Sequence, residues 1–214
     1  MDHNSWLSRS IYHCSKFVLR MGAVSLFGIR TSGREWFPSE GPTLLCVNHQ
    51  SFLDPAIMGL VLQRRLGYIA RKSLFSIPLF STLIQSLGGI PIDRDGFSLE
   101  GIKETLRRLR RGEAVLIFPE GTRSKDGALQ PLRPGFRALA RRGKAQLVAA
   151  GIAGAFQAWP RTQKLPGLAR LGVSLAKPIT PEKIEQLSDE DLVAMLETQM
   201  RDQLETAERL TRPE

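Results

Sequence analysis

A histidine and an aspartate in the stretch NHQSFLD have the types and the spacing needed for acid–base chemistry. His49 follows a short apolar run, and Asp54 comes five positions later. A neutral histidine is the usual general base near pH 7, and a carboxylate that fixes its tautomer and supports the imidazolium makes it a better one. The spacing also fits a loop that ends in a helix cap, because Asp54 precedes Pro55. Both interpretations stay open here, and one aspartate can fill both roles.

The chain offers no obvious nucleophile of its own for such a pair. It has no G-x-S-x-G motif, and its two cysteines, Cys14 and Cys46, lack the electropositive surroundings that make a thiol reactive. Cys46 lies within an apolar run and is expected to be a small core residue. A His–Asp pair in this setting predicts that the substrate brings the nucleophile, for example an alcohol.

A second loop, PEGTRS, has residues that suit an anion. Gly121 permits close backbone approach, Thr122 and Ser124 provide hydroxyls, and Arg123 can hold a phosphate through two parallel hydrogen bonds. A third candidate is Arg94, which follows a tight turn in GGIPIDR. Each signal is weak alone, but the three together indicate a site for an anionic substrate.

Strand-like and helix-like patterns alternate along the chain. Apolar runs predict buried strands at residues 43–48, 66–70, 114–118, 146–152 and 171–176. Capping residues and helical spacing of apolar residues predict helices at 54–65, 99–109, 136–142 and from Ser188 onward. The predicted fold is α/β, a single domain with a mixed, mainly parallel sheet flanked by helices. Both candidate loops follow predicted strands, and sites in such folds gather at strand ends.

The charge of the chain is distributed unevenly. The net charge is +9 and the sequence pI is near 10.1, but residues 182–214 carry −6, so that residues 1–181 carry +15. Such a field favours an anionic partner, which can be a nucleic acid, a phospholipid surface or a phosphate-bearing substrate. Solvated helix faces account for part of these bases.

The N-terminal residues predict contact with a membrane surface. They mix large apolar side chains with cations and almost no acid, as in a helical segment that lies in the membrane interface. We therefore divide the chain into an amphipathic membrane-association segment at 1–30 and a catalytic domain at 31–214. The alternative is an amphipathic helix packed on the domain's own core. Residues 74–87 form a second apolar stretch, and neither stretch has the ~20 apolar residues of a spanning helix.

Basic residues near the second apolar stretch can add attraction to anionic headgroups. No acid occurs between Pro55 and Ile92. The bases in question are Arg64, Arg65, Arg71 and Lys72. The alternative for this cluster is an exposed helix end.

The motifs together resemble a known signature, that of the 1-acylglycerol-3-phosphate acyltransferases, the PlsC-like group of glycerolipid acyltransferases. The first block of that family is a histidine and an aspartate separated by four residues, matched here by His49 and Asp54 in NHQSFLD. The second block ends in an arginine, matched by Arg94, and the third, FPEGTRS, is present letter for letter at 118–124. The fourth block commonly reads V-P-V, whereas the aligned stretch LVAAGIAG has no proline and has Gly151 nearby.

The resemblance implies a role for each matched residue. His49 is the expected catalytic base, which takes the proton from a lysophospholipid hydroxyl as that oxygen attacks an acyl thioester. Asp54 is the expected catalytic partner that orients His49 and stabilises its charge. The expected substrate-binding residues, which hold the acceptor phosphate, are Arg94, Glu120, Gly121, Thr122 and Arg123. Because a carboxylate repels a phosphate, Glu120 is expected to act by orienting Arg123 or Arg94.

The activity implied by the resemblance is transfer of a fatty acyl group to lysophosphatidic acid, which gives phosphatidic acid in phospholipid biosynthesis. The expected donor is acyl-CoA or acyl-carrier protein, and no metal or organic cofactor is expected because the thioester is already activated. The expected location is the cytoplasmic face of the cell membrane, with peripheral or monotopic attachment. The alternative acceptor is another lysophospholipid or a lyso-aminolipid.

Two other classes of function compete with this one. The charge alone fits a nucleic-acid-binding module, but no such motif is present, and the few Trp and Tyr residues are not interleaved with the basic runs. The expected partners therefore include no nucleic acid. A non-catalytic membrane-remodelling protein with the same fold is disfavoured by the intact His49 and Asp54.

Overall fold

The computed structural model of the protein describes residues 28–71, 76, 89–92, 99–163 and 165–213, and seven strands form its centre. The strands are β1 (Arg30–Ser32), β2 (Thr43–Val47), β3 (Leu66–Arg71), β4 (Gly89–Ile92), β5 (Ala114–Ile117), β6 (Gln146–Ala153) and β7 (Gly172–Leu175). The helices are the 3₁₀ turn η1 (Arg34–Trp36), α2 (Asp54–Val61), α4 (Leu99–Arg110), α5 (Gly135–Gly143), α6 (Ala155–Ala158), α7 (Pro181–Gln186) and α8 (Asp189–Thr211).

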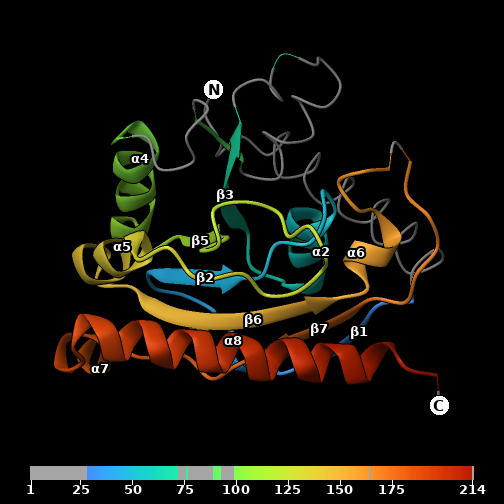
Figure 1. The fold of residues 1–214 in the computed structure, drawn as a ribbon. Helices are drawn as coiled ribbons and strands as arrows, with labels where there is room; N and C mark the ends of the chain where they lie inside the picture. The colour runs from blue at the N-terminus through green and yellow to red at the C-terminus, as the bar shows by residue number, and fades with distance from the viewer. Residues whose placement is uncertain (1–27, 72–75, 77–88, 93–98, 164, 214) are drawn as a thin grey trace.

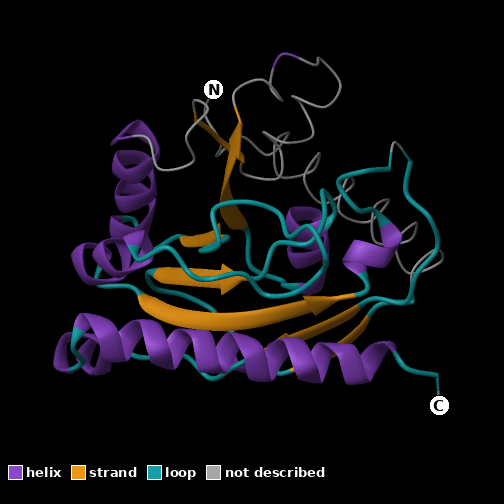
Figure 2. Ribbon diagram, in the orientation of Figure 1, coloured by secondary structure: helices purple, strands orange, loops and turns teal. Residues whose placement is uncertain are grey.

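The strands form one sheet in the order β1-β7-β6-β2-β5-β3-β4. All neighbouring pairs are parallel except β6 and β7, which are antiparallel. Helices lie on both faces of the sheet, with α8 running along β6 on one of them (Figures 1 and 2). The predicted α/β domain with a mixed, mainly parallel sheet is confirmed.

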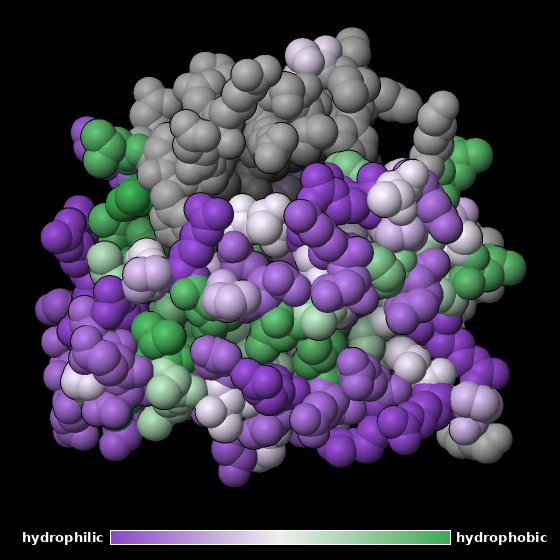
Figure 3. All heavy atoms as spheres, in the orientation of Figure 1, coloured by the Kyte–Doolittle hydropathy of each residue, from purple (hydrophilic) through white to green (hydrophobic). Residues whose placement is uncertain are grey.

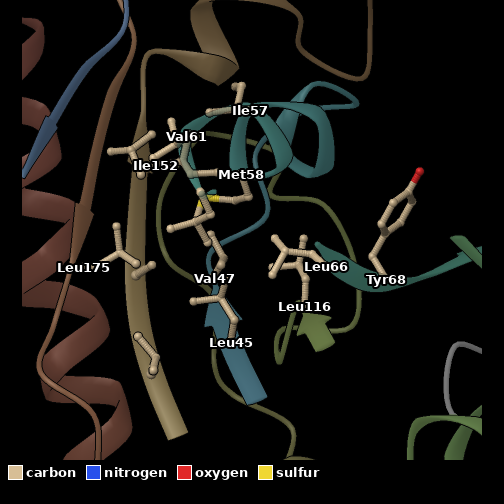
Figure 4. Packing of buried hydrophobic residues seen from close by; sticks show 14 of the residues in the cluster. Leu45, Val47, Ile57, Met58, Val61, Leu66, Tyr68, Leu116, Ile152 and Leu175 are labelled. Carbon is tan, nitrogen blue, oxygen red and sulfur yellow. The ribbon is translucent and has the colours of Figure 1, made fainter. Parts of the chain in front are cut away.

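The core lies on both sides of β2, and this explains its unbroken apolar sequence. Leu45 and Val47 pack with residues of α2 on one face (Figure 4), whereas Leu44 and Cys46 pack with residues of α4, α5, α7 and α8 on the other. A strand that is covered on both faces reads as a continuous apolar run. Burial raises the pKa of the Cys46 thiol far above its usual range, which agrees with its predicted role as an inert core residue.

Two predicted boundaries differ from the structure by more than one residue. The sheet begins earlier than residue 43, because β1 starts at Arg30 and pairs with β7. The helix predicted to reach residue 65 ends at Val61, and Leu62 is already extended. The predicted amphipathic segment falls almost entirely on residues 1–27, which lie outside the described part of the chain. Among the described residues, no helix is long and apolar enough to cross a membrane.

Because α2 ends at Val61, Arg64 lies in the loop before β3, where it stabilises the fold. Its guanidinium donates hydrogen bonds to the carbonyls of Pro38, Gly41 and Gly112 and to the hydroxyl of Thr43. The three carbonyls lie before β2 and β5, and Thr43 is the first residue of β2. The interpretation of Arg64 as a cation for lipid headgroups is therefore wrong, since its donors bind the chain itself.

The close approach of α8 to β6 explains the glycine in the fourth block. A Cβ added at Gly151 would lie 2.3 Å from the backbone nitrogen of Leu204 and 2.4 Å from the carbonyl carbon of Gln203. No side chain fits at that distance, so the strand needs a glycine where the helix backbone crosses it. The departure from the family's proline pattern thus occurs at a packing contact.

Candidate active site

The two candidate loops meet because β2 and β5 are parallel neighbours. Cys46 is paired with Ile117, so both strands end at the same edge of the sheet. The loop at 48–53 follows β2 and contains His49, and the loop at 118–134 follows β5 and contains Arg123. Two motifs that are far apart in the sequence therefore form one site.

His49 and Asp54 form a hydrogen-bonded pair. Nδ1 of His49 lies 2.7 Å from Oδ2 of Asp54, with the aspartate side chain fully buried and the histidine side chain 19% exposed. Because Nδ1 faces a carboxylate, it carries the proton of the neutral ring and leaves the lone pair on Nε2. Nε2 has no hydrogen-bond partner among the residues that the structure describes. The pair is thus arranged for proton abstraction by Nε2.

Asp54 organises the loop before α2 and does not cap the helix. It is the first residue of α2, and Leu53 occupies the cap position without a side-chain hydrogen bond. Oδ2 of Asp54 accepts the backbone N–H groups of Gln50 and Ser51, each at 2.7 Å, in addition to Nδ1 of His49. The helix-cap interpretation is therefore wrong, because Oδ2 accepts its hydrogen bonds from the loop before α2 and from His49 and not from the first turn of the helix.

The loop after β5 holds His49 by its ring and by its backbone. The imidazole stacks on Phe118 with ring centroids 3.8 Å apart and planes inclined by 13°. The backbone N–H of His49 donates to Oε1 of Glu120 at 2.6 Å, and its carbonyl accepts the N–H of Ser124 at 2.7 Å. His49 is consequently fixed in orientation before any substrate binds.

Glu120 joins segments of the site and is not an open anion-binding group. Oε1 accepts from His49, and Oε2 accepts the backbone N–H of Gln130 at 3.0 Å. The residue is only 3% exposed. Burial raises the pKa of Glu120 to about 7, although the hydrogen bonds from His49 and Gln130 act to lower it. A direct contact between Glu120 and substrate stays a prediction, and its burial weighs against one.

Among the residues of this loop that were predicted to bind the phosphate, Thr122 and Arg123 have side chains left for an anion. The backbone N–H of Gly121 donates to the carbonyl of Phe118. It therefore offers an anion less than the sequence predicted, because it already has an acceptor within the loop. Gly121 has a φ of 72°, a left-handed conformation that favours glycine. Gly121 and Thr122 are exposed and Arg123 is half-buried.

Arg123 is supported by an aromatic residue that the sequence did not single out. Its guanidinium carbon lies 3.5 Å from the centroid of the Phe52 ring, and that ring packs on Trp159 at 5.6 Å. A cation over an aromatic face is attracted to it and loses freedom to move. Phe52 is 47% exposed although it is apolar. Phe52 lies inside NHQSFLD, between His49 and Asp54, and this position in the motif could have indicated a role in the site.

A second arginine of the same loop was also missed in the sequence. A Cβ added at Gly121 would lie 2.7 Å from Nε of Arg133, so the Arg133 side chain packs against Gly121 where any other residue would have its side chain. Arg133 is exposed to solvent. Arg94 lies outside the described residues, although β4 ends two positions before it, at the same edge of the sheet.

A third strand end is tied into the site through Asn48. Its side chain donates to the carbonyl of Ile152 at 2.9 Å and accepts the N–H of Ile152 at 2.7 Å. The end of β6, which belongs to the fourth block, is thereby joined to the residue before His49. Within the described part of the chain, no three His, Cys, Asp or Glu side chains cluster closely enough to hold a metal ion.

Comparison with known proteins decides the family. A family model described as Acyltransferase matches residues 28–153, which span β1 to the end of β6 and include both motifs. This chain belongs to the acyltransferase family. It is therefore an acyltransferase, and the predicted enzyme class is confirmed.

Several relatives carry the same name. The 1-acyl-sn-glycerol-3-phosphate acyltransferase of Bacillus subtilis is 28% identical over 172 residues, which cover 79% of this chain and 83% of that protein. A chloroplastic protein of that name from Brassica napus is 31% identical over 191 residues, and the chain spans 51% of its length. The crystal structure of PlsC from Thermotoga maritima has a TM-score of 0.80 at 22% identity, with 96% of this chain and 83% of that one covered, so the two share a fold.

Proposed function

We propose that this acyltransferase is a 1-acyl-sn-glycerol-3-phosphate O-acyltransferase, which converts lysophosphatidic acid to phosphatidic acid. The observation that carries the proposal is the position of the His49–Asp54 pair beside the Arg123 loop, with Nδ1 and Oδ2 2.7 Å apart. A general base next to a cationic loop fits an acceptor that has both a hydroxyl and a phosphate. The names of the relatives from Bacillus subtilis and Brassica napus support the same acceptor.

His49 acts on the acceptor hydroxyl. Its Nε2 takes the proton as the hydroxyl oxygen attacks the carbonyl carbon of the acyl thioester, and Asp54 stabilises the imidazolium that forms. The tetrahedral intermediate then collapses, the carbon–sulfur bond breaks, and the imidazolium returns the proton to the leaving thiolate. The products are an ester and a free thiol, and His49 is regenerated.

The phosphate of the acceptor is held at a distance from this chemistry. Arg123 is the principal ligand, with Thr122 and the exposed turn at Gly121 beside it and Arg94 as a further expected ligand. Anchoring the phosphate makes the attack of the hydroxyl effectively intramolecular. Glu120 contributes by holding His49 in place, because its carboxyl group accepts the backbone N–H of His49.

The reaction takes place at a membrane surface in this proposal, because acceptor and product are lipids. Residues 1–30 attach the catalytic domain of residues 31–214 to the cytoplasmic face of the cell membrane, in a peripheral or monotopic manner. The acyl donor is acyl-CoA or acyl-carrier protein. The mixture of apolar and basic residues in the N-terminal segment supports this attachment.

A matrix of donors and acceptors tests the function. Purified protein is incubated with acyl-CoA or acyl-carrier protein and each of several lysophospholipids, and the products are identified by mass spectrometry. We expect phosphatidic acid from lysophosphatidic acid as the principal product. Acylation of a different lysophospholipid or a lyso-aminolipid in its place would support the alternative acceptor and reject the present one.

A further inference from the structure

The segment between α6 and β7 exposes two large apolar side chains. Leu165 and Leu168 are each 78% exposed, the highest values among the large apolar residues that the structure describes. We call the described residues 159–163 and 165–170 the α6–β7 loop. It projects from the side of the molecule that carries α6 (Figure 1), and hydrophobic atoms stand out at the corresponding right-hand edge of the surface in Figure 3.

Hydrogen bonds fix the shape of this loop. The N–H of Gly167 donates to the carbonyl of Ala158 at 2.6 Å and closes the neck of the loop. Within the loop, Nε1 of Trp159 donates to the carbonyl of Gln163 at 3.1 Å, and the N–H of Gln163 donates to Pro160 at 3.2 Å. These bonds tie down the backbone before Leu165 and between the two leucines, whose exposure to water is unfavourable unless a partner covers them.

The charged residues near the leucines in the sequence are all positive. Residues 127–181 contain nine bases and no acid. Arg161 and Arg170, which flank the leucines, are exposed, and neither has an ion-pair partner among the described residues. An anionic bilayer surface matches this combination, because leucines enter the acyl boundary while arginines meet the lipid phosphates.

The base of the loop is continuous with the active site. Trp159 packs on Phe52, which carries Arg123 on its ring. The hydroxyl of Ser51 also donates to the carbonyl of Trp159 at 2.7 Å. A lipid surface at the tip of the loop would therefore lie on the same side of the domain as the side chains assigned to the acceptor phosphate.

We propose that the α6–β7 loop docks on an anionic lipid bilayer, with Leu165 and Leu168 inserted in the interface and Arg161 and Arg170 at the headgroups. This gives the catalytic domain a membrane contact of its own, separate from residues 1–30. Delivery of the acceptor to Arg123 rests on the proposed function, whereas the docking itself does not.

Fluorescent labelling of the full chain tests insertion directly. On a Cys14→Ser background, where Cys46 is buried, Leu165→Cys carries an environment-sensitive dye and is mixed with phosphatidylglycerol–phosphatidylcholine vesicles. We expect a blue shift with a rise in emission. The matched control is Leu99→Cys, because Leu99 is 76% exposed and lies on α4 at the opposite side of the molecule (Figure 1). An unchanged spectrum at position 165, or an equal shift at position 99, would overturn the proposal.

Vesicle flotation measures the contribution to binding. The full-length Leu165→Asn/Leu168→Asn variant should have a partition coefficient at least about tenfold below that of the wild type. Arg161→Gln/Arg170→Gln should lose about fivefold per arginine on anionic vesicles and nothing on neutral ones. Leu99→Asn should bind as the wild type does. Wild-type binding by the double leucine variant would contradict the proposal.

An activity measurement separates this proposal from the proposed function. All three variants should keep normal turnover on lysophosphatidic acid dispersed in detergent, and the leucine and arginine variants should lose activity on vesicles that contain it. If the wild type acylates no lysophospholipid, the proposed function fails while the dye and flotation results still decide the docking.

Discussion

The backbone N–H of His49 donates a hydrogen bond of 2.6 Å to Oε1 of Glu120, a residue 71 positions later in the chain. The other oxygen of the same carboxyl accepts the N–H of Gln130. One buried side chain therefore joins the loop after β2 to the loop after β5. The PEGTRS motif therefore positions the histidine as well as presenting an arginine, and serves both halves of the site.

Glu120→Gln should remove a pH-dependent part of the stability. Burial raises the pKa of Glu120 from 4.5 to about 7, so the folded protein holds a proton that the unfolded chain releases in this window. The stabilising contribution is complete below about pH 4.5 and is lost as the pH rises through about 7. Chemical denaturation across this range should show the wild-type free energy of unfolding falling relative to the variant. A difference that is independent of pH would contradict the assignment.

Asp54→Asn should lower turnover by about 10²-fold or more, because the amide cannot stabilise the imidazolium or enforce the Nδ1–H tautomer. Asp54→Ala should lose turnover as well and should also be less stable, since it leaves the N–H groups of Gln50 and Ser51 without their acceptor, at about 1–3 kcal/mol for each. Steady-state kinetics and thermal denaturation separate the two effects. Full turnover in Asp54→Asn would argue that the aspartate is only structural.

Arg123→Lys should raise the apparent KM for the acceptor more than that for the donor, because lysine keeps the charge but loses the fork that binds a phosphate at two points. Phe52→Leu should weaken acceptor use in the same direction by roughly 2–5-fold, since it removes the ring under the guanidinium. Phe52→Tyr is the matched control and should behave as the wild type does. An increase confined to the donor KM would place this loop on the donor side.

Gly151→Ala should lower the free energy of unfolding by about 1–3 kcal/mol, because the added Cβ meets the backbone of α8. Gly59→Ala is the control. Gly59 lies within α2 and an added Cβ there has nothing within 4 Å, so the change should stabilise the protein by about 0.5–1 kcal/mol. Equal effects of the two substitutions would mean that α8 does not pack on Gly151 as described.

The parts of the fold and site that the sequence predicted are those with a local signal. β2 and β5 were predicted because burial on both faces leaves an uninterrupted apolar run, and the His49–Asp54 contact spans only five positions. The loops were predicted to form one site because parallel strands end at a common edge.

What the sequence did not reveal depends on contacts between distant segments. The bond from Glu120 to His49 follows from the register of β2 against β5, and the place of Phe52 under Arg123 follows from the path of both loops. β1 has only three residues and β4 contains Pro91, so neither gives a strand pattern. The role of Arg64 depends on carbonyls from two other loops, which no local pattern encodes.

Turnover of His49→Ala is the most direct test of the central claim, that His49 is the base that activates the acceptor hydroxyl. Initial rates with lysophosphatidic acid and an acyl thioester are compared with those of the wild type, after thermal denaturation has shown that the variant is folded. The account predicts a loss of about 10²–10⁴-fold in turnover with little change in acceptor binding, because His49 does not hold the phosphate. A folded variant with near-normal turnover would contradict it.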